Sequence, residues 1–489
     1  MVKTRNAIKT RNAIKTKIIC TIGPASRDPE ILERLMTAGM NVCRLNFSHG
    51  TQEEHAVLIR DIREISARLE KPVAILQDLA GPKIRTGPMA SGSIMLVEGA
   101  AFRLTNRDVP GDASEVGLTY PDLPRTVQAG DALLLADGLM ELVVESTDET
   151  DVNCRVVTGG ELGSHKGINL PTRTIDAPIL SEKDLSDLEF GLAQDVDFVA
   201  LSFVRNAADI EKANKIIHAA GKDTPVIAKI EKFEALDQID EIIAAAGGIM
   251  VARGDLGVEI PLEQVPRAQK MIIARTNAAA KPVITATQML RSMVDNPRPT
   301  RAEVTDVANA ILDGTDAIML SEETAMGSFP VEAVEVMSRV AADTEMGFDF
   351  EGWTEKFKLD HTLSFEAAVA HSAVEMAMDI GAGAIITCTK SGSTTRLVAR
   401  HRPRQTLLAM TPDPKTALEM ALVFGAVPMI TPMVENGEAL EKMAITGAFK
   451  GGYVKKGDAV VITAGLPFHV EGTTNLIKVA RVGRKDGTS

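Results

Sequence analysis

Aromatic residues are scarce in this chain. Phe, Trp and Tyr make up 3% of the 489 residues, so its cores must be built from aliphatic side chains and from the 21 methionines. A hydrophobic content of 45% is nevertheless ample for large cores. The length indicates about three domains at ~150 residues each.

Cysteine clusters, long apolar runs and excess positive charge are also missing. The four cysteines lie far apart without a CxxC spacing, which argues against structural zinc or a disulfide framework and favours a reducing compartment. No apolar run reaches the ~18 residues of a membrane span, and no apolar signal region follows the N-terminus. The net charge of −13 argues against nucleic-acid binding. We therefore expect a cytoplasmic protein that binds neither membranes nor nucleic acid.

Two glycine-rich nucleotide signatures are absent as well. The chain has no GxxxxGK[ST] sequence, and its nearest Gly-Lys pair, Gly221-Lys222, continues with Asp223. No GxGxxG follows a predicted strand. Any nucleotide must therefore be bound by a device other than a P-loop or a dinucleotide fingerprint.

What the chain has is an alternation of apolar, strand-like runs with amphipathic helical segments, which is typical of a parallel sheet with crossover helices. Eight such repeats predict a closed (β/α)8 TIM barrel, an α/β fold whose site lies at the carboxyl ends of its strands. The predicted strands are Lys17–Ile22, Asn41–Phe47, Val73–Leu79, Val196–Val204, Val226–Glu231, Ile249–Asp255, Pro282–Thr287 and Ala317–Ser321.

The alternation also predicts the domain organisation. After the third strand, Gly, Asp and Thr punctuate short segments over residues 87–171, which predicts an inserted all-β lid domain. We assign residues 16–86 and 172–352 to the barrel, and 353–489 to a C-terminal open α/β domain. Residues 1–15, where TRNAIK occurs twice, form an N-terminal arm because so short a repeat cannot build a solenoid.

The fifth and sixth strands carry the most informative polar residues. Lys229 and Glu231 are two apart on a short buried strand, so their side chains point to the same side. Asp255 follows 24 residues later (255 − 231), about one strand-helix unit on. Two carboxylates beside a lysine suit a Mg²⁺ ion that handles phosphate. The alternative is a structural ion pair at the barrel rim.

Further polar residues end the neighbouring strands. Arg44, Asn46 and Ser48 are spaced by two, so they share one side of the second strand. The third strand ends in Asp78 and continues into the sequence GPKIRTG, which offers Lys83 and Arg85 where the lid begins. Solvated rim charge is the alternative for each cluster alone. On the seventh strand Thr287 offers a hydroxyl, and the amides around Gly254 offer a nest for a carboxylate.

Eight motifs in order along residues 16–480 resemble the pyruvate kinase family. They are CTIGPAS (20–26), RLNFSHG (44–50), GPKIRTG (81–87), KGINLP (166–171), AKIE (228–231), VARGDLG (251–257), TATQML (285–290) and RPTRAEVTDVANAI (298–311). The resemblance implies transfer of the phosphoryl group of phosphoenolpyruvate to ADP, giving pyruvate and ATP in the last step of glycolysis. It also implies a homotetramer.

The resemblance further implies a role for each matching residue. Glu231 and Asp255 would hold Mg²⁺ or Mn²⁺, and Lys229 would neutralise the phosphoryl group and the forming enolate. Thr287, with the amides of Gly254 and Asp255, would hold the substrate carboxylate and help deliver a proton. Arg44 would face the transferring phosphoryl group. The positions that match nucleotide contacts are Asn46, His49, Arg85 and Lys166.

One departure from the family concerns the monovalent cation. Potassium-dependent members carry Glu in a GPE sequence where this chain has Lys83. A lysine ammonium would put a positive charge where the cation acts, so we expect that potassium is not required.

A loop in the C-terminal domain is a candidate effector site. Thr389, Lys390, Ser391, Gly392, Ser393 and Thr394 form a strand-to-helix turn rich in donors, which suits the phosphate of a sugar-phosphate or nucleotide effector. The late loop at residues 465–472 lacks the arginines seen in members that respond to a sugar bisphosphate. An unregulated enzyme is therefore the alternative.

Two other functions remain as hypotheses. A different barrel enzyme that binds phosphoenolpyruvate or pyruvate, such as an aldolase or mutase, would also use a metal with acidic ligands. However, it would leave the lid and the arginines facing ADP without a purpose. A catalytically inactive metabolite sensor would be expected to lose Lys229, Glu231 or Asp255, and the chain keeps all three.

Overall fold

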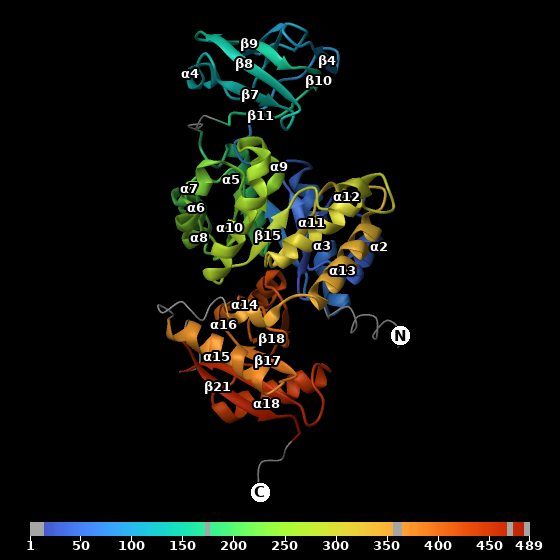
Figure 1. Cartoon of the computed structure of the whole chain (residues 1–489), viewed down its shortest axis with the longest axis vertical. Helices are drawn as coiled ribbons and strands as arrows, with labels where there is room; N and C mark the ends of the chain where they lie inside the picture. Colours follow the sequence, from blue (N-terminus) through green and yellow to red (C-terminus); the bar gives the residue numbers. More distant parts are fainter. Residues whose placement is uncertain (1–13, 172–176, 356–363, 467–472, 484–489) are drawn as a thin grey trace.

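The computed structural model describes residues 14–171, 177–355, 364–466 and 473–483. Figure 1 shows three parts stacked along the long axis, with the lid at one end, the barrel in the middle and the C-terminal domain at the other end. Residues 1–13, which hold most of the duplicated TRNAIK segment, and residues 467–472 of the late loop lie outside the described residues.

The middle part is a closed barrel of eight parallel strands within the described chain, in the order β1-β16-β15-β14-β13-β12-β3-β2. This confirms the predicted TIM barrel. Its strands are β1 (Lys17–Ile22), β2 (Val42–Asn46), β3 (Ala74–Asp78), β12 (Phe198–Leu201), β13 (Val226–Ile230), β14 (Gly248–Ala252), β15 (Val283–Ala286) and β16 (Ala317–Leu320).

Helices surround this barrel (Figure 1). They are α2 (Pro29–Ala38), α3 (Gln52–Arg68), α5 (Glu182–Ala193), α6 (Ala207–Ala219), α7 (Glu234–Asp237), α8 (Ile239–Ala245), α9 (Arg253–Glu259), α10 (Val265–Ala278), α11 (Arg301–Leu312), α12 (Glu322–Ala325) and α13 (Pro330–Met346). The short helix α14 (Phe350–Glu355) follows them and lies beside α16 (Ser393–Ala399) of the C-terminal domain (Figure 1). Capping boxes fix where α3, α5 and α11 begin. Between β13 and β14 the helical segment is divided into two pieces, α7 and α8.

Apolar side chains fill the barrel interior, so it is a packed core. Ile19, Leu76, Ile227 and Met250 belong to this interior cluster, and Leu422 of the C-terminal domain joins it. The C-terminal domain therefore lies against the amino ends of the strands. The opposite, carboxyl end is where the chain leaves β3 for the lid, and there the polar strand ends are free to form a site.

The lid is mostly β, with one short helix, α4 (Leu123–Thr126), within the described residues. The expectation of an all-β insertion is therefore right except for this turn of helix. Its strands are β4 (Ser93–Leu96), β5 (Ala101–Thr105), β6 (Glu115–Gly117), β7 (Ala132–Leu135), β8 (Met140–Thr147), β9 (Asp151–Thr158), β10 (Gly160–Gly163) and β11 (Ile168–Asn169). They form one sheet in the order β11-β7-β8-β9-β5-β6 and a pair β10-β4.

The C-terminal domain is an open sheet in the order β19-β18-β17-β20-β21, in which β21 runs antiparallel to β20. Helices pack on both sides of it, as the predicted open α/β domain requires (Figure 1). Its elements are α15 (Phe365–Asp379), β17 (Ala384–Cys388), α16 (Ser393–Ala399), β18 (Thr406–Thr411), α17 (Pro414–Glu419), β19 (Ala426–Ile430), α18 (Gly437–Lys450), β20 (Ala459–Gly465) and β21 (Thr474–Arg481).

No helix among the described residues combines the length and the hydrophobicity that a bilayer span requires.

Candidate active site

Lys229 lies at the centre of a charge cluster at the carboxyl end of the barrel. It stands one residue before the end of β13, and its Nζ donates a hydrogen bond of 2.7 Å to Ser202 Oγ. The same Nζ lies 3.2 Å from Asp78 Oδ1 and 3.0 Å from Glu231 Oε1. Strands β3, β12 and β13 thus bring Asp78 and Ser202, which are distant in the sequence, next to Lys229 and Glu231.

Burial and pairing set the charges in this cluster. Burial disfavours the charged form of Lys229, but Asp78 and Glu231 outweigh it and raise its pKa above the ordinary value. Burial likewise opposes ionisation of Asp78, yet Arg44 and Lys229 hold the pKa of this carboxyl below its usual range. The pKa of Glu231 is raised, chiefly by burial, and repulsion from Asp255 acts in the same direction. A further cation beside Glu231 would relieve that repulsion.

Arg44 joins the cluster from β2. Its Nε donates to Asp78 Oδ2 at 2.6 Å, and its Nη1 donates to Thr21 Oγ1 at 2.9 Å. Asn46 and His49 lie beyond it and make local contacts: Asn46 Oδ1 accepts from the backbone N–H of Ser48, and His49 is exposed. These two residues therefore flank the cluster without being part of it.

Thr287 and Gly254 face one another beside the cluster. A Cβ on Gly254 would lie 2.6 Å from Thr287 Cγ2, so the glycine permits this close approach. Thr287 has φ 77°, a left-handed conformation that costs a β-branched residue energy and is found mainly at functional sites. Arg253 holds it there, since its Nη2 donates to Thr287 O at 2.7 Å.

Asp255 lies in a different secondary-structure element from the one that the sequence predicts. It lies in α9 and not at the end of a strand. Its Oδ1 pairs with Lys83 Nζ at 3.0 Å, and it is close enough to Glu231 to raise the pKa of that carboxyl.

The two carboxylates fit a Mg²⁺ ion that also binds a substrate. Within the described residues, no group of three or more His, Cys, Asp or Glu side chains could hold a metal by itself. Mg²⁺ is typically bound through one or two carboxylates, with substrate oxygens and water completing the shell. A cation bound between Glu231 and Asp255 would offset the repulsion between these two carboxylates.

Arg85 and Lys166 lie where the lid joins the barrel. Arg85 Nη1 donates to His165 O at 3.2 Å, and the backbone of Arg85 forms an antiparallel bridge with Gly167. Lys166 is anchored by its backbone N–H to Thr86 Oγ1, which leaves its side chain exposed. Both residues thus belong to the junction of lid and barrel, and neither forms a hydrogen bond or ion pair with Lys229 among the described residues.

Comparison with known proteins gives the family. Residues 13–334 match the model of the pyruvate kinase barrel domain, and residues 367–480 match that of the pyruvate kinase alpha/beta domain. The chain is 44% identical to a pyruvate kinase of Clostridium acetobutylicum, covering 95% of this chain and 98% of the relative. It is 46% identical to one of Staphylococcus saprophyticus, covering 96% and 80%. The chain belongs to the pyruvate kinase family.

It is accordingly a phosphotransferase that converts phosphoenolpyruvate and ADP to pyruvate and ATP in glycolysis, and its family uses a divalent metal. This sets aside the aldolase or mutase and the inactive sensor as alternatives.

Two contacts of the candidate site were not anticipated from the sequence. Ser202, directly after β12, accepts the hydrogen bond of Lys229, and Arg253 holds the backbone of Thr287. Ser202 could have been found as the first polar residue after the fourth barrel strand. The partner of Arg253 lies 34 residues on, so only the folded chain reveals it.

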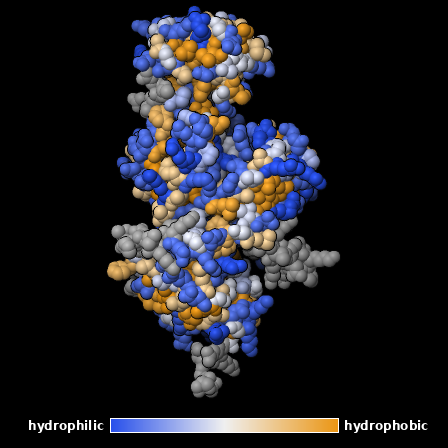
Figure 2. Space-filling model, viewed as in Figure 1, coloured by the Kyte–Doolittle hydropathy of each residue, from blue (hydrophilic) through white to orange (hydrophobic). Residues whose placement is uncertain are grey.

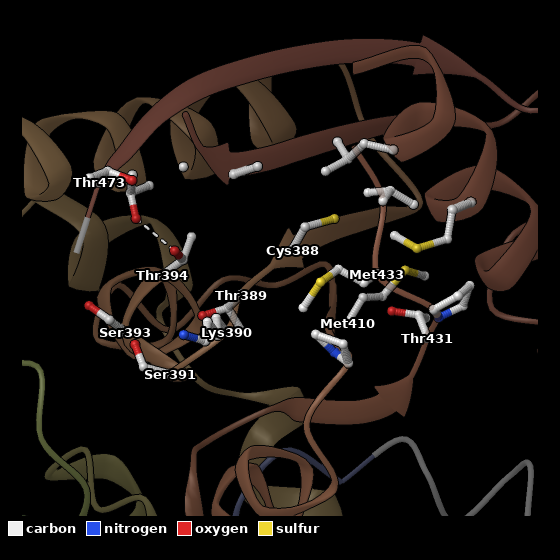
Figure 3. Close-up of a pocket in the computed structure, with 18 residues that line it drawn as sticks. Cys388, Thr389, Lys390, Ser391, Ser393, Thr394, Met410, Thr431, Met433 and Thr473 are labelled. Carbon is white, nitrogen blue, oxygen red and sulfur yellow. Dashed lines mark hydrogen bonds between the residues drawn. The ribbon is translucent and has the colours of Figure 1, made fainter. Parts of the chain in front are cut away.

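The effector loop predicted for this pyruvate kinase lines a pocket in the C-terminal domain. Figure 3 shows Thr389, Lys390, Ser391, Ser393 and Thr394 on one side and Met410, Thr431 and Met433 on the other. Thr394 Oγ1 shares a hydrogen bond of 2.6 Å with Thr474 Oγ1. Gly392 is not among the lining residues; it turns the loop with φ 76° and packs against Met420.

Proposed function

We propose that phosphoryl transfer from phosphoenolpyruvate to ADP takes place beside Lys229, at the carboxyl end of the barrel. The observation that carries this proposal is the buried ammonium held among Asp78, Glu231 and Ser202. Phosphoryl transfer requires mainly positioning and neutralisation of charge. A fixed, protonated lysine supplies positive charge to the phosphoryl group in flight and to the forming enolate without reorganising at the moment of reaction.

Glu231 and Asp255 would hold the divalent metal, Mg²⁺ or Mn²⁺. The bound ion would neutralise phosphoryl oxygens and fix the orientation of phosphoenolpyruvate. Asp78 would keep Lys229 and Arg44 in place, since it contacts both of them. Arg44 then meets the transferring phosphoryl group with the guanidinium edge that Asp78 leaves free.

Thr287 and the amides of Gly254 and Asp255 would bind the carboxylate of the substrate. The close approach of Gly254 to Thr287 supports a shared subsite. From that place the Thr287 hydroxyl would help deliver a proton to the enolate. Asn46, His49, Arg85 and Lys166 would contact the phosphates and ribose of ADP, with the lid excluding water.

The Lys83 ammonium would replace the monovalent cation of potassium-dependent relatives. Its position 3.0 Å from Asp255 Oδ1 supports this role, because a positive charge is already fixed beside a metal-binding carboxylate. Burial opposes its charged form, but Asp255 and Asp137 outweigh burial and raise the pKa of Lys83. It therefore stays charged across the physiological pH range.

The test is product formation with and without potassium. Pyruvate and ATP are measured from phosphoenolpyruvate, ADP and Mg²⁺, with potassium replaced by a bulky inert cation and then restored. Equal rates are expected for the wild-type chain, and partial potassium dependence for Lys83→Glu. Strong activation of the wild type by potassium would refute the role of Lys83 while leaving the kinase activity intact.

The C-terminal pocket supports a second, regulatory proposal. Its donor-rich loop would bind the phosphate of a sugar-phosphate or nucleotide effector, with Lys390 as the cation. Velocity curves over a panel of sugar phosphates and nucleoside monophosphates test this. Curves that none of these compounds changes would leave an unregulated enzyme.

Assembly, location and domain limits remain proposals as well. We propose a homotetramer in the cytoplasm, with the barrel at residues 16–86 and 172–352, the lid at 87–171 and the C-terminal domain at 353–489. Large exposed apolar side chains support self-association: Met346 is 80% exposed and Phe365 87% exposed. Figure 2 shows apolar residues gathered on parts of the lid and of the C-terminal domain. Light scattering of the purified chain would give its mass.

A further inference from the structure

Lys83 lies in the hinge, which is the segment of residues 79–86 that joins β3 to the lid. Its side chain lies next to Asp255, the proposed metal-binding carboxylate. Its Nζ is 3.0 Å from Asp255 Oδ1 on the barrel and 3.4 Å from Asp137 Oδ1 on the lid. The Lys83 side chain is 21% exposed, whereas Asp137 is 73% exposed. One ammonium therefore bridges two parts of the chain that are far apart in sequence.

The turn that carries Asp137 is tied to the hinge by backbone contacts. Ala136, Asp137 and Gly138 connect β7 to β8 with left-handed φ angles of 49°, 57° and 84°. Ala136 N–H donates to Gly167 O at 3.0 Å, and Ile168 N–H donates to Ile84 O at 2.9 Å. These bonds hold the turn, the return strand of the lid and the hinge next to Lys83 in one small unit.

The same turn reaches the helix that carries Asp255. A Cβ on Gly138 would lie 3.7 Å from Val258 Cγ1 in α9, which is ordinary van der Waals contact. The lid therefore comes close to α9 at the place where Lys83 bridges lid and barrel.

Gly167 confines the side chain of Lys83. A Cβ on Gly167 would lie 2.7 Å from Lys83 Cε and 3.9 Å from Asp137 Oδ1. Gly167 is not among the glycines with positive φ, so its backbone would accept alanine without strain. The atom that must move is the far end of a flexible lysine. The backbone conformation at position 167 therefore does not require glycine. The space that the Lys83 side chain occupies is what requires it.

We propose that Asp137 and Gly167 are positioning residues of the lid, which hold the Lys83 ammonium against Asp255. Docking of the lid then places a fixed positive charge beside the metal-binding carboxylate, in addition to excluding water. This inference rests on the proposed function of Lys83 as the replacement for a monovalent cation. An exposed ion pair alone is worth little, but here the packing of Gly167 and the second carboxylate, Asp255, fix the same ammonium.

The chemical reactivity of Lys83 tests the proposal without any assay of catalysis. The metal-free and substrate-free protein is treated with an amine acetylating reagent, and the rate at Lys83 is measured by peptide mass spectrometry relative to Lys212 on the exposed face of α6. Losing a carboxylate partner releases the Lys83 side chain toward the reagent, so Asp137→Asn should be labelled about three- to fivefold faster. Gly167→Ala should show the same direction, and Asp137→Glu should restore slow labelling.

The matched control is Asp122→Asn. Asp122 is a lid carboxylate that pairs with Arg125 at 3.6 Å and is 63% exposed. Its replacement should leave the labelling of Lys83 unchanged. Labelling of Lys83 within about twofold of wild type in both Asp137→Asn and Gly167→Ala would overturn the proposal. If Gly167→Ala fails to fold, Asp137→Asn alone decides.

A kinetic measurement separates this inference from the proposed function. In Asp137→Asn and Gly167→Ala, the KM for ADP should rise more than kcat falls, and added potassium should recover part of the loss. If the wild type itself requires potassium, the proposed role of Lys83 is wrong, yet the labelling rates still decide whether the lid holds this lysine. A wild type without pyruvate kinase activity would leave the labelling test equally decisive.

Discussion

Among single residues, Lys229 combines burial with two ion pairs at the site, to Asp78 and to Glu231. Replacing it by Met removes the ammonium, so Glu231 loses its ion pair and Asp78 keeps only the one with Arg44. Loss of one preorganised charge-stabilising group typically costs about 10²–10³ in kcat, and we expect a loss of at least about this size here. Steady-state kinetics of Lys229→Met measure it.

The control for this substitution is Lys212→Met, since Lys212 lies on the exposed face of α6. It should retain wild-type kcat. A Lys229→Met enzyme with undiminished kcat would place the chemistry elsewhere.

Lys17 gives a pH-dependent prediction at the other end of the barrel. Its ammonium is buried and donates to Ala426 O, and burial lowers its pKa to about 7, with Lys71 acting in the same direction. Between pH 7 and its ordinary value of 10.5, the unfolded chain holds a proton that the folded chain does not. The free energy of unfolding therefore rises with pH in this window, by up to ~1.4 kcal/mol per pH unit.

Replacing Lys17 by Met should remove most of that rise. Lys15, whose pKa burial lowers to about 8, would still contribute in the same direction. Thermal midpoints at pH 7 and pH 9.5 test this, with Lys212→Met as the exposed control. An unchanged difference between the two pH values in Lys17→Met would show that Lys17 does not titrate in this way.

Whether a contact of the site could be predicted from the sequence depends on how far apart its two residues lie along the chain. Lys229 lies in β13 and Glu231 follows directly after its end, so a spacing of two was enough to bring them together. Arg44 could be assigned to the same rim, because all strands of a barrel end at one face. The contact of Asp137 with Lys83 could not be predicted, since it depends on how the lid folds back over 54 residues.

At the scale of elements, strand positions were predictable and some boundaries were not. The eight barrel strands are short, mostly apolar runs between polar turns, and their nearly complete burial leaves few other structures open to them. The break between α7 and α8 has no Gly or Pro to mark it, and Gln238 there simply leaves the helical conformation. Asp255 was expected at a strand end because the apolar run of β14 continues directly into α9.

The packing of α9 against the end of β15 leads to a prediction about Gly254. A methyl group there would lie 2.6 Å from Thr287 Cγ2, and a threonine side chain is too short to move aside. Displacement of Thr287 by a fraction of an ångström should lower kcat/KM for phosphoenolpyruvate about 10- to 100-fold in Gly254→Ala.

Gly257→Ala is the matched control on the same helix. Its Cβ would lie 3.4 Å from Leu262 Cδ1 and 3.6 Å from Val265 Cγ2, distances that require no movement of a neighbour. Its kcat/KM should remain near that of the wild type. Equal losses in both variants would indicate a general effect on α9 and not a specific contact with Thr287.

At the scale of the whole molecule, Arg402 joins the C-terminal domain to the floor of the barrel. It is 1% exposed, and its guanidinium lies 3.0 Å from Asp316 Oδ1 while also donating to Gly314 O and Asn277 Oδ1. Its Cζ stacks 4.5 Å from the ring centroid of Phe424. A buried ion pair is costly to break from one side, because the remaining charge is left buried without its partner.

Arg402→Met should therefore uncouple the two domains. It would leave Asp316 with backbone donors only, at a cost of about 3–5 kcal/mol.

Trp353, the single tryptophan of the chain, lies 5.9 Å from Arg402 Cζ, so its fluorescence reports on this interface directly. We expect its emission to shift to the red on heating at a lower temperature than the loss of far-UV circular dichroism, whereas the two changes should coincide in the wild type. The exposed Arg404→Met, two residues away, should behave as the wild type does. Coincident transitions in Arg402→Met, at the wild-type midpoint, would mean that the remaining contacts between barrel and C-terminal domain suffice without this ion pair.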